Sequence, residues 1–165
     1  MNEFSFSVPQ NITVGKGSLA KLPEIAKKSG GSHVFLMSGP HLEKMGLVEK
    51  AANSLKSAGI SVDTFTDIEG NPSVETVDKA TAAFKEAGAD FIVAFGGGSP
   101  MDVAKAVGVT AKYGGSITEY EGAHKVPGPI IPLIAIPTTA GTGSEVTAFS
   151  VMRFFRLTQF WMQNF

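Results

Sequence analysis

Short apolar runs alternate along the chain with stretches in which apolar residues recur every three or four positions. The short runs are rich in β-branched and aromatic residues and predict strands over 4–8, 11–14, 33–37, 60–65, 91–95 and 133–136. The three- and four-residue spacing predicts helices over 18–28, 42–55, 74–87 and 101–111. Strands that alternate with helices of this length form right-handed βαβ units. The pattern therefore predicts an α/β fold with a mostly parallel sheet and flanking helices.

The stretch from Gly96 to Lys105 follows the predicted strand 91–95 directly and reads Gly-Gly-Gly-Ser-Pro-Met-Asp-Val-Ala-Lys. We call residues 96–98 the glycine turn, because glycine lets the backbone bend sharply and approach a ligand. Ser99, Pro100 and Asp102 then have the residue types of an N-cap, a first helical residue and a first-turn acid. Free amides and the helix dipole at such a turn favour a phosphate. The same residues also fit an ordinary helix start, and the stretch is neither a G-x-G-x-x-G fingerprint nor a P-loop.

A second polar loop follows the predicted strand 133–136 and reads Pro-Thr-Thr-Ala-Gly-Thr-Gly-Ser-Glu over 137–145. We call residues 138–147 the threonine loop. Its hydroxyls suit hydrogen bonds to phosphate or ribose oxygens, although the composition also fits an ordinary turn. The loops at Ser38-Gly39 and Asn71-Pro72 follow other predicted strands. Ligands of parallel sheets bind beyond the carboxyl ends of the strands, so we expect these loops to face one crevice.

Composition narrows the possible functions. The chain has 165 residues, 43% hydrophobic and 18% charged, with a net charge of −1 and no cysteine. This size fits one domain. The charge predicts neither a nucleic-acid nor a membrane partner, and the absence of cysteine excludes disulfides and thiolate chemistry. The N-terminus lacks the pattern of a signal peptide, and no apolar run reaches about 18 residues. We therefore expect a cytoplasmic protein.

Residues 96–105 and 137–147 together resemble the iron-containing (group III) alcohol dehydrogenase family, and Asn71-Pro72 matches a further short element of it. The resemblance runs from about residue 4 to residue 151. It implies a Rossmann-like, dehydroquinate synthase-like N-terminal domain over 1–150 that binds NAD or NADP. The family's reaction is reversible hydride transfer between a small alcohol, or its aldehyde, and the nicotinamide. Fe²⁺ or Zn²⁺ acts in it as a Lewis acid.

The resemblance also implies which residues contact the cofactor. Gly97, Gly98 and Ser99 would hold the pyrophosphate, and Asp102 would lie near the nicotinamide end. The hydroxyl side chains of the threonine loop would line the adenine-ribose and phosphate side. The complete set implied is Gly39, Asn71, Gly97, Gly98, Ser99, Asp102, Thr138, Thr139, Thr142, Ser144 and Thr147. Many members carry an Asp after the second strand, where this chain has Ser38-Gly39-Pro40, so NADP remains open beside NAD.

The sequence departs from the family in its histidines and its C-terminus. His33, His41 and His124 lack metal-ligand spacing, and we assign no metal ligand and no catalytic residue in this chain. The family's helical metal domain would lie beyond residue 165 and is absent here. Residues 151–165 form an atypical aromatic tail with the only tryptophan. We hypothesise that a frameshift near codon 152 replaced the genuine continuation. The alternatives are a natural short variant whose tail covers the sheet and an amphipathic membrane tail.

Three functional hypotheses follow. The first is the cofactor-binding half of a metal-dependent alcohol dehydrogenase, truncated, with weak dinucleotide binding and no turnover. The second is a non-catalytic nucleotide-binding module that forms a homo-oligomer or docks on a full-length paralogue. The third is an inert product of a damaged gene.

Overall fold

The computed structural model describes residues 11–148, 150–153 and 162–163. Within these residues, a four-stranded parallel sheet has the order β2-β1-β3-β5. Its strands are β1 (His33–Ser38), β2 (Ser61–Phe65), β3 (Phe91–Gly96) and β5 (Leu133–Pro137). The helices are α1 (Leu22–Lys28), α2 (Pro40–Lys44), α3 (Leu47–Ser57), α4 (Val74–Ala87) and α5 (Gly98–Tyr113), with short 3₁₀ helices at Ser18–Lys21 and Ile117–Tyr120. The parallel strands β4 (Gly122–Ala123) and β6 (Met162–Gln163) form a separate short pair.

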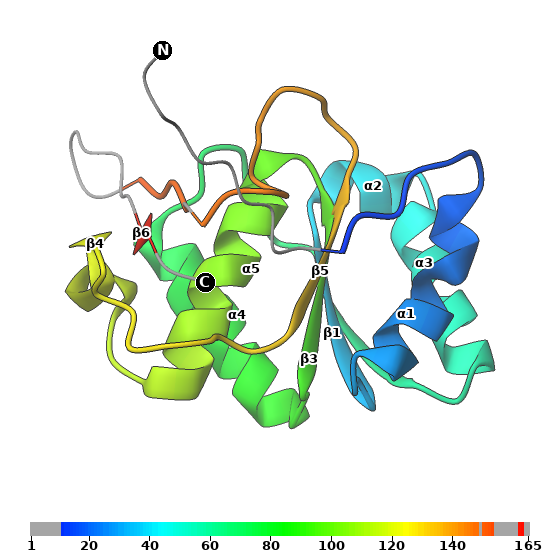
Figure 1. The fold of residues 1–165 in the computed structure, drawn as a ribbon, viewed down its shortest axis with the longest axis horizontal. Helices are drawn as coiled ribbons and strands as arrows, with labels where there is room; N and C mark the ends of the chain where they lie inside the picture. The colour runs from blue at the N-terminus through cyan, green and yellow to red at the C-terminus, as the bar shows by residue number, and fades with distance from the viewer. Residues whose placement is uncertain (1–10, 149, 154–161, 164–165) are drawn as a thin grey trace, which may run out of the picture.

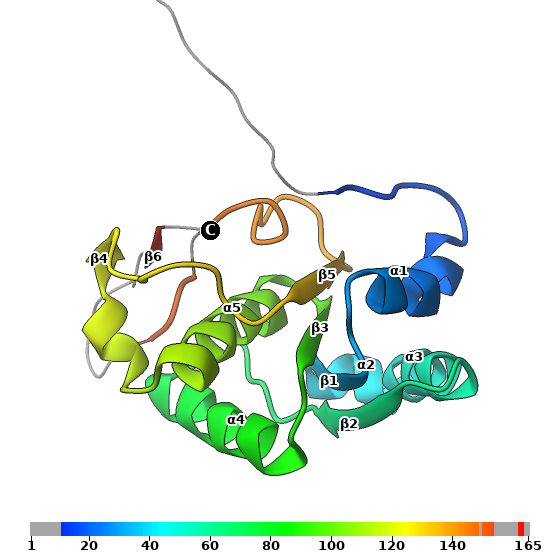
Figure 2. The same ribbon diagram turned by 60° about the horizontal axis from the view of Figure 1, so that its bottom comes forward.

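The sheet is the middle of three layers, with α4 and α5 on one face and α1 and α3 on the other (Figures 1 and 2). Side chains of β1 alternate between the two faces, as the pleat requires. Phe35 and Met37 pack with α4 and α5 in one buried cluster, and Val34 and Leu36 pack with α1 and α3 in the other. Phe35 meets Phe84 of α4 edge to face, with ring centroids 5.5 Å apart. Burial on both faces explains why the central strands are continuous apolar runs.

The strand order reverses between β1 and β3. The chain leaves β1 outward to β2, returns through α4 to β3, and then continues outward to β5. The connections after β1 and β3 therefore lead to helices on opposite faces of the sheet (Figure 1). A crevice forms at such a switch point, beyond the carboxyl ends of the two strands.

The structure confirms the predicted fold class and most predicted elements. The strand predicted over 11–14 is wrong, because these residues form no strand and Ile12 and Val14 are exposed. The single helix predicted over 42–55 is wrong as well. It is two helices, broken at Gly46, whose φ of 71° is left-handed, and Met45 is 58% exposed. The strand predicted over 4–8 and most of the aromatic tail lie outside the described residues.

No helix in the part of the chain described by the structure is long and apolar enough to cross a lipid bilayer.

Candidate functional site

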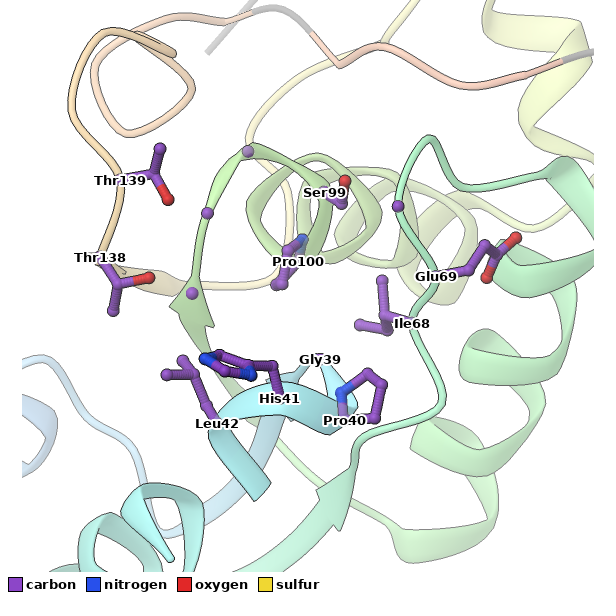
Figure 3. A pocket seen from close by; sticks show the side chains of 14 residues that line it. Gly39, Pro40, His41, Leu42, Ile68, Glu69, Ser99, Pro100, Thr138 and Thr139 are labelled. Atoms are coloured by element: carbon purple, nitrogen blue, oxygen red, sulfur yellow. The ribbon is translucent and has the colours of Figure 1, made fainter. Parts of the chain in front are cut away.

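A cavity of about 500 Å³ opens at the carboxyl edge of the sheet, beside the ends of β1, β3 and β5. Figure 3 shows Thr138 and Thr139 on one side of it, His41 and Leu42 of α2 below, and Ser99 and Pro100 at the start of α5. Fourteen residues from four loops and helix ends line it: Gly39, Pro40, His41, Leu42, Ile68, Glu69, Gly70, Gly96, Gly97, Gly98, Ser99, Pro100, Thr138 and Thr139. The glycine turn, the start of the threonine loop and the loop at Gly39 thus meet at a single cavity, whereas Asn71 and Pro72 are not among its lining residues.

The glycine turn brings the N-terminus of α5 into this cavity. The N-cap is Gly97 and no side chain caps the helix. The prediction that Ser99 is the N-cap and Asp102 a first-turn acid is therefore wrong, because the helix begins at Gly98, two residues before Pro100, and its first turn contains no acid. The first amides of a helix need an external acceptor, and the dipole of this 16-residue helix favours a negative one.

Close packing explains why the turn consists of glycines. A Cβ at Gly96 would lie 2.8 Å from Cγ of Pro100, and φ at this glycine is +154°. A Cβ at Gly97 would lie 3.1 Å from Oγ1 of Thr139, and a Cβ at Gly98 3.3 Å from Oγ of Ser144. Side chains at Gly97 and Gly98 would push the threonine loop away from the helix start, and a side chain at Gly96 would collide with Pro100. The glycines thus let the start of α5 and the threonine loop approach each other closely.

The threonine loop is attached to the glycine turn by its backbone. The amide of Thr138 donates to the carbonyl of Gly96 at 2.8 Å, continuing the pairing of β5 with β3. Further along, the amide of Ser144 donates to Oγ1 of Thr142 at 3.4 Å. Thr138 and Thr139 are exposed and line the cavity, so their hydroxyls are available to a ligand.

The loop after β2 forms the opposite wall with Ile68, Glu69 and Gly70. The carboxylate of Glu69 accepts hydrogen bonds from the Ser73 amide at 3.0 Å and from the Thr76 hydroxyl at 2.8 Å. Burial, the largest influence, raises the pKa of Glu69, but hydrogen bonds from its own backbone amide, from Thr76 and from Ser73 together outweigh burial and hold the pKa below its usual value. The side chain points away from the cavity in Figure 3, towards the start of α4. The Glu69 carboxylate therefore holds the loop after β2 against the start of α4.

Two implied cofactor residues lie behind the cavity wall instead of lining it. Asp102 is buried in α5, where Oδ1 lies 3.0 Å from Nζ of Lys105 and Oδ2 accepts from the Val151 amide at 3.1 Å. Thr147 contributes its backbone oxygen to Lys105 at 3.4 Å. Burial lowers the pKa of Lys105 more than the neighbouring Asp102 raises it.

The structure places the implied residues in three groups relative to the cavity. Gly39, Gly97, Gly98, Ser99, Thr138 and Thr139 line it. Thr142 and Ser144 lie beside its wall, against the Cβ position of Gly98. The lining does not include Asn71, Asp102 or Thr147. Asn71 has a left-handed φ of 56°. Whether each contacts a cofactor stays a prediction.

Several lining residues were not singled out from the sequence: Pro40, His41, Leu42, Ile68, Glu69 and Gly70. Their signal was their place, since each follows the carboxyl end of β1 or β2. Leu42 and Ile68 carry no sequence signal for a ligand, because apolar residues of this type also occupy ordinary core positions.

The described residues do not fit an iron or zinc ion, because no group of three or more His, Cys, Asp or Glu side chains among them could hold a metal. His33 pairs instead with Asp63, with Nε2 and Oδ2 2.7 Å apart. His41 lines the cavity and is exposed. We therefore derive no step through a metal ion.

Comparisons with known proteins agree with this geometry. The sequence profile of the iron-containing alcohol dehydrogenases matches residues 9–156. The NAD-dependent methanol dehydrogenase of Bacillus methanolicus is 34% identical over 148 residues, which cover 90% of this chain and 39% of that protein. The structure is similar to that of a 1,3-propanediol oxidoreductase, with a TM-score of 0.91, 33% identity, and coverage of 98% of this chain and 42% of the other.

A second solved structure is that of the sulfoacetaldehyde reductase from Bifidobacterium kashiwanohense in complex with NAD⁺. It has a TM-score of 0.84 and 34% identity, and the match covers 92% of this chain and 40% of that one. The chain thus spans about two fifths of the length of these relatives.

Proposed function

The chain belongs to the iron-containing alcohol dehydrogenase family, and from this premise we propose that it binds a nicotinamide dinucleotide in the cavity, with the pyrophosphate at the glycine turn. The observation that carries the proposal is the start of α5, a 16-residue helix whose N-terminus has no side-chain cap and opens into the cavity. Its amides and dipole favour a doubly charged pyrophosphate.

The remaining lining divides into two sides around that point. On one side, the hydroxyls of Thr138 and Thr139 are exposed and supply donors and acceptors for phosphate or ribose oxygens. On the other side, the half-buried Leu42 supplies an apolar surface suited to the flat face of a base, and Ile68 beside the cavity is apolar but almost fully buried. The Cβ position of Gly39 lies 3.4 Å from the backbone oxygen of Ile68, so a side chain at this position would contact the loop that carries Ile68.

When bound, the nicotinamide supplies hydride acceptance or donation, and this chain's residues hold and orient it. For the complete catalytic unit we propose reversible hydride transfer between a small alcohol and its aldehyde. The support is the names of the relatives, which include a methanol dehydrogenase and a 1,3-propanediol oxidoreductase. We assign no catalytic residue within the described part of the chain.

We propose that the site accepts both NAD(H) and NADP(H). An acidic side chain after β1 would repel a 2′-phosphate and accept bonds from the ribose hydroxyls. This chain has Gly39 and Pro40 at that point, and the carboxylate of Glu69 is engaged by Ser73 and Thr76. The Glu69 side chain also points away from the cavity in Figure 3, so its charge is directed away from the space that an additional phosphate would occupy.

Fluorescence titration of the purified 165-residue chain with NADH and with NADPH tests both proposals. We expect saturable binding of each, with dissociation constants within about tenfold of each other, a difference of about 1.4 kcal/mol. ADP-ribose should compete with both, because it carries the pyrophosphate and lacks the nicotinamide. Absence of saturable binding would overturn the dinucleotide site, and a hundredfold preference for NADH would overturn the relaxed cofactor preference.

A further inference from the structure

Lys105 and Asp102 form a buried charge pair one turn inside α5, behind the wall of the cavity. Their side chains are 3% and 9% exposed, and Nζ lies 3.0 Å from Oδ1. Charged side chains are rarely buried to this degree unless a partner requires it. The pair contributes nothing to the cavity lining, so the dinucleotide site described above does not account for it.

The contacts of the pair extend from the helix to two segments far along the chain. The Lys105 ammonium donates to the carbonyl oxygens of Ser144 at 3.0 Å and Thr147 at 3.4 Å. The Asp102 carboxylate accepts from the Val151 amide at 3.1 Å, and its backbone oxygen accepts from Oγ of Ser150 at 2.7 Å. One turn of helix thus anchors both ends of the segment between Ser144 and Val151.

The anchored loop in turn determines the geometry beside the helix N-terminus. Oγ of Ser144 lies 3.3 Å, and Cβ of Thr142 3.5 Å, from the position that a Cβ of Gly98 would occupy. Within the distal half of the loop, the amide of Val146 donates to the carbonyl of Gly143 at 3.1 Å and closes a turn. A turn closed on itself does not fix its distance from α5, whereas the contacts of Lys105 do.

We propose that Lys105 is a positioning residue, which holds the threonine loop against the start of α5 so that both can contact the dinucleotide pyrophosphate. The inference rests on the proposed function for its ligand. Lys105 lies outside the cavity, but its hydrogen bonds keep the cavity in the shape that binds the ligand. A loop that is already held in its bound position loses less conformational entropy when the ligand binds.

The test combines a local and a functional measurement on the full chain. Lys105→Met keeps the length of the side chain and removes the ammonium. The double variant Asp102→Asn/Lys105→Met avoids an unpaired buried carboxylate, which would otherwise destabilise the fold. Lys105→Arg restores a cation that can reach the same carbonyls. Thr110→Val is the matched control, because it removes a buried 2.6 Å hydrogen bond to Thr81 from the same helix, away from the loop.

Hydrogen exchange of peptides covering 142–148 reports on the loop, and NADH titration reports on the site. We expect Lys105→Met and the double variant to exchange faster in these peptides alone and to bind NADH about tenfold more weakly, as for loss of hydrogen bonds from a charged group. Lys105→Arg should restore most of the protection of the loop from exchange and most of the NADH affinity. Thr110→Val should lower the melting temperature and change neither readout beyond about twofold.

Two results would overturn the proposal. If peptides covering 142–148 exchanged in the double variant at the same rate as in the wild type, Lys105 would not hold the loop. Faster exchange with unchanged NADH affinity would show that the loop does not shape the site. If the wild-type chain itself bound no dinucleotide, the proposed function would fail and the binding role with it, while the exchange data would still decide whether Lys105 anchors the loop.

Discussion

Replacing Gly98 by alanine should weaken dinucleotide binding while leaving the fold nearly as stable as before. The substituted Cβ would lie 3.3 Å from Oγ of Ser144 and 3.5 Å from Cβ of Thr142. The contact with Ser144 requires a movement of a few tenths of an ångström, and the contact with Thr142 is an ordinary van der Waals distance. The packing cost therefore falls near the lower end of the range of about 1–3 kcal/mol for overfilled sites. Alanine in place of glycine in a helix stabilises the fold by up to about 1 kcal/mol. The net change in the free energy of unfolding should therefore stay within about 1 kcal/mol, or about 2–4 °C in melting temperature.

The effect on the ligand is larger, because the new methyl group lies between the first amides of α5 and the threonine loop. Displacing one hydrogen bond to a charged phosphate costs about 1.5–3 kcal/mol. We therefore expect the dissociation constant for NADH to rise at least about tenfold. Gly70→Ala is the matched control, since Gly70 lines the same cavity and a Cβ there would meet nothing within 4 Å.

Fluorescence titration and thermal melting of both variants separate the two effects. Gly98→Ala should lose affinity with a small change in melting temperature, and Gly70→Ala should change neither markedly. Equal NADH affinity in the two variants would refute the placement of the pyrophosphate at the glycine turn. A collapse of the fold in Gly98→Ala would refute the packing argument instead.

Three further substitutions test the fold. Burial, the largest influence, raises the pKa of Asp90, but hydrogen bonds from Ser32 and the following amide outweigh it and keep the pKa low. The ionised Asp90 carboxylate therefore stabilises the fold fully above its unfolded pKa of about 3.9, and this stabilisation is lost as the pH falls through the lower pKa of the folded state. Asp90→Asn should lower the melting temperature at pH 7 and should make the melting temperature decline less steeply between pH 5 and 2. Ser38→Ala removes a buried 2.7 Å bond to the carbonyl of Phe95 and should cost about 1 kcal/mol in urea unfolding. Gly46→Ala forces a left-handed φ of 71° on alanine and should cost about 1–2 kcal/mol in the same assay.

Hydrophobic periodicity predicted the layers well, because β1 and β3 are buried on both faces and α4 presents one apolar stripe to the sheet. It failed at Gly46. Leu42, Met45 and Val48 remain in helical phase across the break, so spacing alone predicts one helix. The left-handed φ at Gly46 divides it, and Met45 turns to solvent. Periodicity reports on which residue types recur, and it contains no information on the dihedral angles between them.

The candidate site was predictable as far as it depends on the backbone. Glycines after β3 and hydroxyls after β5 lie where parallel-sheet topology places ligands, and both line the cavity. The role of Lys105 was not predictable, because a lysine on a helix usually faces solvent. Its burial depends on Asp102 and on carbonyls some 40 positions later in the chain, at Ser144 and Thr147. Contacts of that range arise only when the chain is folded.

Five of the fourteen residues lining the cavity are glycines, at positions 39, 70, 96, 97 and 98. A wall made of glycine offers a ligand peptide groups, which every amino acid possesses, and offers few side chains. Mutational drift cannot delete such groups; it can only obstruct them by adding bulk. The wall contributed by Pro40, His41, Leu42 and Ile68 consists of side chains and can change identity without disturbing the peptide surface opposite. The cavity thus joins a part whose chemistry is common to all sequences with a part whose chemistry is open to selection.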